Sequence, residues 1–292
     1  MSGYEVELVL DAHAQLGEGP IWDHRCSQLI WVDILAGEVH GFDPRTARDS
    51  VVDVGSHVGA AALRAEGGLV LAVREGFATL ESGSGAVRPL SKVAANGNRL
   101  RFNDGRCDSR GRFWAGTMAY DGSRGAGSLY RLEQDHRVAP VLAGVSISNG
   151  IGWSPDDRTL YYIDTPTGWI DAFDYEAEPG ELGKRRHLAR VEAAGAAPDG
   201  MAVDAEGFLW VALWGGSAVH RYDPEGRLER IVRLPVSQVT SCAFGGPDLD
   251  ELYITSASRG LTAEQLERQP HAGALFRHRA RAQGRLEHMY GG

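Results

Sequence analysis

The sequence predicts an all-β fold: a six-bladed β-propeller that forms one domain over residues 1–292 and is closed by an N-terminal strand joining the last blade. Three observations predict it. A turn motif recurs six times, short strand-like runs alternate with turn signals, and sustained helical periodicity is almost absent. Self-similarity at a period of about 40 to 50 residues is typical of propellers. A sandwich of many short strands is the structural alternative, but it does not explain why one turn pattern recurs at one offset.

The repeated unit consists of a lead residue, a short apolar run, a turn that opens five residues after the lead residue, and then an aromatic or aliphatic strand. Residues 197–210 show it in full, with lead residue Asp199 and the turn Asp-Ala-Glu-Gly at 204–207. The six lead residues are Glu18, Gly59, Asn103, Asn149, Asp199 and Thr240. Successive copies are therefore 41, 44, 46, 50 and 41 residues apart, which suits one four-stranded blade per copy.

Strand-like runs lie between Gly-Ser, Asp-Pro and Pro-Glu-Gly turns in each repeat. Residues 5–11 alternate polar and apolar side chains for most of their length, so they predict a half-buried strand that needs a partner. The sixth repeat offers only three strands (240–244, 251–257 and 274–280). We therefore expect the N-terminal strand to complete that sheet and protect its edge. The one helical stretch, 261–269, has Thr262 as its predicted N-cap.

Composition limits the function. A formal net charge of −9 disfavours nucleic acid or an anionic membrane as a general partner. Three scattered cysteines predict neither a disulfide framework nor a Cys-x-x-Cys metal site. The N-terminus lacks the features of a signal peptide, and no apolar run reaches the length of a membrane helix. We expect a soluble, cytoplasmic protein, and the sequence does not indicate an oligomeric state.

The lead residues point to a metal site. The innermost strands of a propeller run along its axis, so equivalent positions form a ring; five of the six lead residues carry a side-chain oxygen and none is Lys, Arg or His. Two carboxylates in one buried ring are costly without a counter-charge. Carboxylate and amide oxygens suit a hard divalent cation. For any single residue the alternative is a turn cap that bonds its own backbone.

Short motifs in all but the second repeat give the chain a family resemblance. They are Leu-Gly-Glu-Gly-Pro-Ile-Trp at 16–22, Arg-Phe-Asn-Asp-Gly at 101–105, Phe-Trp-Ala-Gly-Thr-Met at 113–118, Ser-Asn-Gly at 148–150, Pro-Asp-Gly-Met at 198–201, Leu-Trp-Val-Ala at 209–212 and Thr-Ser-Cys-Ala-Phe-Gly-Gly at 240–246. With these motifs the chain resembles the senescence marker protein/gluconolactonase family, the regucalcin-like sugar lactonases. The likeness covers nearly the whole chain.

The resemblance implies a propeller with one divalent metal ion at the channel mouth. The family's metal ligands fall on Glu18, Asn149 and Asp199, its general acid/base on Asp199, and its substrate-binding residues on Arg101 and Asn103. Some members use another acid shortly after Gly-Thr-Met; here the nearest match is Asp121, in a loop that differs from the animal members. Ca²⁺ is the first expectation for the metal, and Zn²⁺, Mn²⁺, Mg²⁺ and Fe²⁺ are alternatives.

These residues support a hypothesis of aldonolactone hydrolysis. The metal would polarise the lactone carbonyl, Arg101 and Asn103 would hold the sugar, and Asp199 would accept a proton from water. A metal-bound carboxylate is a poor base, so the alternative is that the cation activates the water and Asp199 is mainly a ligand. Gluconolactone and the pentonolactones are candidate substrates that the sequence does not separate. Trp214, before a Gly-Gly turn, is a candidate for lining the mouth, and His57 is the histidine nearest a lead position.

Two other functions compete with this hypothesis. One is a non-catalytic propeller that binds calcium or a protein partner, which would not need Arg101 and Asn103 beside the metal residues. The other is a metal-dependent arylesterase or phosphotriesterase, which would favour a more apolar mouth and a catalytic histidine. Fold alone does not choose among these functions.

Overall fold

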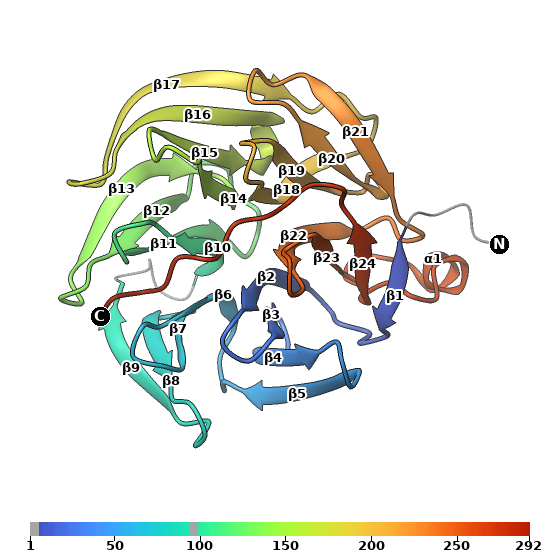
Figure 1. The fold of residues 1–292 in the computed structure, drawn as a ribbon, viewed down its shortest axis with the longest axis horizontal. Coiled ribbons are helices and arrows are strands. Elements are labelled where there is room, and N and C mark those ends of the chain that lie inside the picture. The colour runs from blue at the N-terminus through green and yellow to red at the C-terminus, as the bar shows by residue number, and fades with distance from the viewer. Residues whose placement is uncertain (1–5, 94–98) are drawn as a thin grey trace.

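The structure is a computed structural model that describes residues 6–93 and 99–292. The described residues form six four-stranded antiparallel sheets, here called blades, which are arranged as a ring around a common axis (Figure 1). This ring confirms the predicted all-β propeller. The first strand lies nearest the axis in the five blades whose strands are consecutive in the chain, and residues 239–245 take this place in the sixth. No helix in the described parts of the chain is long and apolar enough to cross a membrane.

Blades 1 to 3 each contain four strands that are consecutive in the chain. Blade 1 is β2 (Gly17–Asp23), β3 (Gln28–Asp33), β4 (Glu38–Asp43) and β5 (Arg48–Asp53). Blade 2 is β6 (Val58–Leu63), β7 (Leu69–Val73), β8 (Gly76–Leu80) and β9 (Val87–Lys92). Blade 3 is β10 (Leu100–Cys107), β11 (Phe113–Ala119), β12 (Gly127–Leu132) and β13 (Val138–Val145).

Blades 4 and 5 follow the same pattern, and blade 6 does not. Blade 4 is β14 (Ser148–Trp153), β15 (Thr159–Asp164), β16 (Trp169–Glu176) and β17 (Glu181–Arg190), with the 3-10 helix η1 (Thr165–Thr167) between β15 and β16. Blade 5 is β18 (Ala197–Val203), β19 (Leu209–Trp214), β20 (Ala218–Tyr222) and β21 (Leu228–Arg233). Blade 6 is β22 (Val239–Gly245), β23 (Glu251–Ser256), β24 (Leu275–Arg279) and, on the outside, β1 (Glu7–Leu10).

The ring closes in blade 6, where the N-terminal strand β1 pairs antiparallel with β24. Glu7 lies opposite Arg277 in this pairing, and their side chains form an ion pair of 2.7 Å. The predicted strand at 5–11 is therefore β1, although Glu5 lies outside the described residues. The predicted helix is α1 (Ala263–Arg268), in the connection from β23 to β24, and Thr262 caps it together with Gln265 in a capping box.

The apolar core is divided among the junctions between blades. The described buried apolar residues form six clusters, and each cluster combines side chains of two neighbouring blades. The cluster between blades 3 and 4, for example, packs Trp114 edge-on against Trp153 with ring centroids 5.9 Å apart. Because each blade buries its faces only against its neighbours, the ring is stabilised as a whole.

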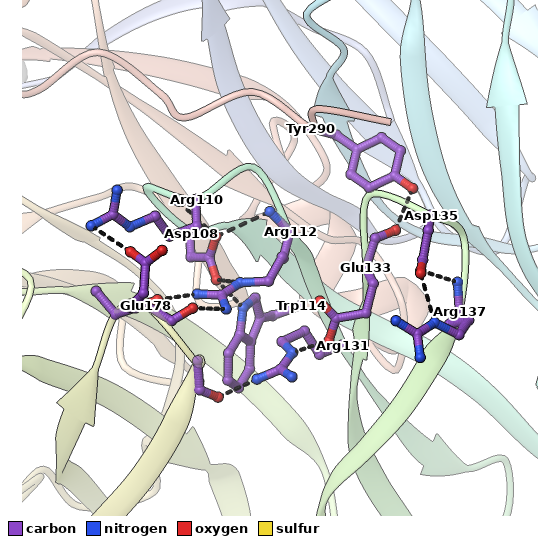
Figure 2. Close-up of polar contacts among 12 residues, drawn as sticks. Asp108, Arg110, Arg112, Trp114, Arg131, Glu133, Asp135, Arg137, Glu178 and Tyr290 are labelled. Atoms are coloured by element: carbon purple, nitrogen blue, oxygen red, sulfur yellow. Dashed lines mark hydrogen bonds and ion pairs between the residues drawn. The ribbon is translucent and has the colours of Figure 1, made fainter.

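The Asp of the repeated turn has a structural role in blades 3 and 5. Asp108 is fully buried; its Oδ1 accepts hydrogen bonds from the backbone of Arg110 and Arg112, and its Oδ2 accepts one from Trp114 Nε1 at 2.8 Å (Figure 2). Asp204 makes the same contact with Trp210 Nε1 at 3.0 Å. In these two blades one carboxylate therefore holds both the turn and the aromatic side chain of the next strand.

A segment at the end of the chain crosses the ring. We call residues 281–292 the C-terminal strap; it runs from β24 over the blades toward β9 (Figure 1). It lies where the innermost strands end. Its contacts run through blades 6, 5, 4, 3 and 2 in turn: Gly284 N to Leu249 O (2.7 Å), Ala205 N to Gln283 O (2.8 Å), Arg285 Nη1 to Trp153 O (3.2 Å), Arg106 Nη1 to Glu287 Oε1 (2.6 Å) and Tyr290 N to Leu63 O (2.7 Å).

Tyr290 anchors the far end of the strap. Its side chain is fully buried, and its hydroxyl donates to the backbone oxygen of Glu133 at 2.7 Å (Figure 2). The strap therefore ties blades 2 and 3 to blade 6 on the face of the ring opposite to the starts of the innermost strands. That leaves the other face for the candidate site.

Candidate active site

The six lead residues lie near the start of the six innermost strands, in the same place in every blade. All six are buried. In each blade the pairing of the innermost strand with its neighbour shifts at or beside the lead residue, for example between Glu18 and Ile21 and between Pro198 and Met201. Such a bulge releases the backbone from regular pairing and redirects a side chain. It accounts for lead residues that face the axis at one end of the ring.

Two of the lead residues serve packing. A Cβ at Gly59 would overlap the backbone of Phe102 in the next blade, so this position requires glycine for the close approach of two strands. The hydroxyl of Thr240 donates to Gly17 O at 2.5 Å and contacts Thr255 Oγ1, so it ties blade 6 to blade 1. The site is therefore made by the other four lead residues.

These four residues line one cavity of about 180 Å³ at this end of the ring. The cavity brings together five of the six residues that the sequence predicted for the site: Glu18, Arg101, Asn103, Asn149 and Asp199. Leu16, Met118 and Ile147 form apolar walls, and Trp214 lines the cavity as the sequence suggested. A cavity of this kind, with apolar walls and a few convergent polar groups, is typical of a small-molecule site.

A chain of hydrogen bonds fixes the arginine and the two asparagines of the site. Arg101 Nη1 donates to Asn103 Oδ1 at 2.7 Å, and Asn103 Nδ2 donates to Asn149 Oδ1 at 3.0 Å. Asn149 Nδ2 in turn donates to Thr165 Oγ1 at 2.8 Å, and that hydroxyl donates to Pro198 O. Each amide thus has one orientation that satisfies the network, which directs the oxygen of Asn149 toward Asn103.

The two carboxylates form the charged part of the site. Burial, and then the nearby carboxylates of Asp199 and Asp104, raise the pKa of Glu18 well above its usual value. Burial, followed by repulsion from Asp104, raises the pKa of Asp199 in the same way. Burial also lowers the pKa of Arg101 to about 10. The carboxylates therefore occupy a place where negative charge is poorly compensated.

The residues present fit a hard divalent cation. Asp199 Oδ1 is buried and has no hydrogen-bond partner among the described residues, while Glu18 Oε2 accepts a bond from Gly19 N. The described residues contain no group of three or more His, Cys, Asp and Glu side chains arranged to hold a metal. The candidate ligand set is therefore mixed, with two carboxylates and the amide of Asn149. Such an all-oxygen set favours Ca²⁺, Mg²⁺ or Mn²⁺.

Asp121 lies apart from these residues. Its side chain is exposed and accepts hydrogen bonds from the backbone and hydroxyl of Ser123, and Arg99 lies 3.7 Å away. It does not belong to the described residues that line the cavity; Tyr120 does. The predicted contact of Asp121 with substrate stays a prediction. His57 is held at the rim by a bond of 2.7 Å between its Nδ1 and the Tyr120 hydroxyl.

Among the polar residues that line the cavity, sequence reasoning missed Tyr120, Thr165 and Arg259. Tyr120 directly follows β11, and the expectation of an acid in this loop points to its neighbour Asp121 instead. Thr165 follows β15 at the start of η1, and Arg259 lies in the connection from β23 to α1. No repeated position or local motif marks Thr165 and Arg259, because connections differ from blade to blade.

Comparisons with known proteins identify the family of the chain. A model of the SMP-30/Gluconolactonase/LRE-like region matches residues 16–258. The chain is 41% identical over 283 residues to regucalcin from Xenopus laevis, covering 95% of each chain. It is 39% identical over 270 residues to a putative sugar lactone lactonase from Bacillus subtilis, covering 92% of each.

Solved structures give the same result. A calcium-binding protein, regucalcin from Agrobacterium tumefaciens, is similar with a TM-score of 0.94 at 30% identity, covering 98% of this chain and 97% of that one. A gluconolactonase from Xanthomonas campestris has a TM-score of 0.76 at 24% identity, covering 94% and 89%, a level that supports the fold alone. The chain therefore belongs to the SMP-30/gluconolactonase/LRE-like family.

Proposed function

We propose that this chain is a metal-dependent sugar lactonase, which opens an aldonolactone to the open-chain acid. One observation carries the proposal: the unpartnered, buried Asp199 Oδ1 lies with Glu18 in the cavity that Arg101 and Asn103 also line. A site that only buffers a cation does not need a guanidinium and an oriented amide beside it. The match to the SMP-30/gluconolactonase/LRE-like family and the relative named as a putative sugar lactone lactonase support the same reaction class.

Glu18, Asn149 and Asp199 would hold the cation. When bound there, a divalent ion supplies a Lewis acid that polarises the lactone carbonyl and stabilises negative charge on its oxygen. Arg101 is already directed by its bond to Asn103, so its remaining N–H groups are free to donate to the substrate. Asn103 holds the amide of Asn149 in place and orients the neighbouring hydroxyl of the sugar.

The reaction that these residues would assist consumes one water. The water oxygen forms a bond to the carbonyl carbon as Asp199 accepts a proton from it, and the bond between that carbon and the ring oxygen then breaks. Asp199 returns the proton to the ring oxygen, which leaves as a hydroxyl. The product is the open hydroxy acid.

Acid release from a panel of neutral aldonolactones tests the proposal. The spontaneous opening rate is subtracted, and the protein is assayed before chelation, after chelation and with divalent ions added back one at a time. We expect turnover that is lost on chelation and restored by one ion. Cation binding without turnover of any lactone would overturn the proposal in favour of a non-catalytic calcium-binding propeller.

A further inference from the structure

The cavity carries a second arginine that the reaction above does not use. Arg259 lines it from the connection between β23 and α1, and its side chain is exposed. No hydrogen bond or ion pair joins its guanidinium to any described residue. Other arginines of the described residues, such as Arg25, Arg106 and Arg221, form ion pairs with carboxylates. Arg259 is instead a cation that lines the cavity without a paired anion.

The backbone of Arg259 is nevertheless held in place. Its N–H donates to Gln15 O at 3.0 Å, and the preceding Ser258 donates to Ala14 O through both its N–H (3.1 Å) and its hydroxyl (2.9 Å). This connection is therefore tied to the segment that leads into β2 and Glu18. The Cα atom of Arg259 is therefore fixed relative to the carboxylates, whereas the guanidinium of Arg259 is free to reach a ligand.

The charge balance of the cavity indicates what that ligand carries. The charged residues of the lining are two acids, Glu18 and Asp199, and two bases, Arg101 and Arg259. Arg101 forms hydrogen bonds only with neutral oxygens, those of Phe102 and Asn103. A divalent ion held by the acids cancels their charge, so the two guanidiniums remain as an excess of two positive charges on the walls. Such a cavity attracts an anion and rejects a cation.

The two arginines come from different blades, and the positive charge of Arg259 opposes the positive charge of Arg101. An acid group between them would remove that repulsion. A guanidinium also offers paired N–H donors that match the two oxygens of a carboxylate or phosphate. A neutral sugar hydroxyl gains much less from the same donors.

We propose that the preferred substrate is an anionic sugar lactone, which bears a carboxylate or phosphate remote from its lactone carbonyl, and that Arg259 binds this group. The inference rests on the proposed lactonase function and names its substrate class. Arg259 is thus a specificity-determining residue, whereas the reacting carbonyl binds near Arg101 and the acid residues. Carboxylate and phosphate share the recognition chemistry, and the experiment separates them.

The test compares three lactones of one carbon skeleton: D-glucono-1,5-lactone, its 6-phosphate and the lactone in which carbon 6 is a carboxylate. Each is assayed with the unaltered protein, Arg259→Gln, Arg259→Lys and the control Arg74→Gln. Arg74 is a rim arginine that pairs with Glu75 at 3.1 Å and does not line the cavity. Its replacement removes the same charge from the same end of the ring.

We expect kcat/KM to be at least about tenfold higher for one of the charged lactones than for the neutral one, in line with a charge-assisted contact. Arg259→Gln should lower that ratio about tenfold or more, mainly through KM; Arg259→Lys should keep part of it and Arg74→Gln all of it. The charged lactone with the larger ratio identifies the acid group. A ratio near one, or an equal ratio in Arg259→Gln, overturns the inference.

Binding of products gives a readout that does not depend on turnover. Calorimetry should show that glucarate or 6-phosphogluconate binds more tightly than gluconate, and that this difference shrinks in Arg259→Gln. The measurement is made with metal-loaded and with chelated protein, and the preference should be larger in the loaded protein. If no lactone is hydrolysed at all, the proposed function fails; if the neutral lactone is hydrolysed without any preference, the inference alone fails.

Discussion

Asn103 Nδ2 donates a hydrogen bond to Asn149 Oδ1 at 3.0 Å, and it joins blade 3 to blade 4 at the base of the cavity. Asn103 is itself held by Arg101 and by the backbone oxygen of Ser148. A residue of the substrate-binding set therefore orients a residue of the proposed metal-binding set. Binding of the cation and of the sugar should depend on each other through this amide.

Removal of the Asn103 amide tests that dependence. Asn103→Ala leaves Asn149 without the donor that orients it, so we expect divalent-cation affinity to fall about 10- to 100-fold, the usual effect of losing a group that positions a ligand. Calorimetry with Ca²⁺ measures it. The matched control is Thr240→Val, at the equivalent position of blade 6, where the hydroxyl bonds Gly17 O outside the cavity. That variant should lose stability and keep its cation affinity.

Asp199→Asn separates two roles of the carboxylate. The amide keeps an oxygen for the cation and removes the base, so a base role predicts retained cation binding with kcat lowered about 10²- to 10⁴-fold. Glu18→Gln is the comparison, because we expect it to weaken binding more than turnover at saturating metal. Full activity of Asp199→Asn would contradict the base assignment.

The cation-free protein should lose stability as the pH rises. The folded-state pKa values of Glu18 and Asp199 are raised, mainly by burial, so the folded protein holds protons that the unfolded chain releases near pH 4. The stabilising contribution is complete below that pH and is lost as the pH rises through the raised values. Urea unfolding of chelated protein between about pH 5 and 8 measures this loss.

Two controls accompany the pH series. Bound cation should flatten the pH dependence, because it replaces the protons, and its affinity should increase with pH. The double variant Glu18→Gln/Asp199→Asn should flatten it without any metal. A pH dependence that persists in the double variant would assign the effect to other groups.

Asp204 should matter for stability and little for the site. It is fully buried, bonds Trp210 Nε1 at 3.0 Å and pairs with Arg221 at 2.7 Å. Asp204→Ala leaves a buried guanidinium with less compensation, so we expect the free energy of unfolding to fall by about 3–5 kcal/mol. Cation affinity at permissive temperature should stay within about twofold. A large loss of affinity with unchanged stability would refute the structural assignment.

The C-terminal strap should be needed to hold the ring closed. Tyr290→Ala removes a fully buried ring at its far end, so we expect a loss of about 3–5 kcal/mol, and Tyr290→Phe should lose only about 1 kcal/mol with the bond to Glu133 O. Leu286→Ala is the control in the same strap, since Leu286 is 54% exposed and should change stability by less than about 0.5 kcal/mol. Thermal unfolding of the three variants distinguishes anchoring from a dispensable tail.

The sequence by itself determined the blades, because their signals are local. The Asp108 and Asp204 turns bond their own backbone within four residues, and the next strand supplies the tryptophan six residues later. Interactions over such short separations recur wherever the same residues recur. The period of the motif therefore predicted the number of blades, the innermost strands and the lead residues that face the axis.

Only the tertiary structure decided which residues share the cavity. Gly59 and Thr240 occupy the same repeat position as Glu18 and Asp199, yet close approach of neighbouring blades assigns them to packing. Arg259 enters the cavity because Ser258 and Arg259 bond to the segment before β2, more than two hundred residues away in the chain. Ring closure sets such contacts, and the connections that make them follow no repeat, so no local pattern encodes where their side chains converge.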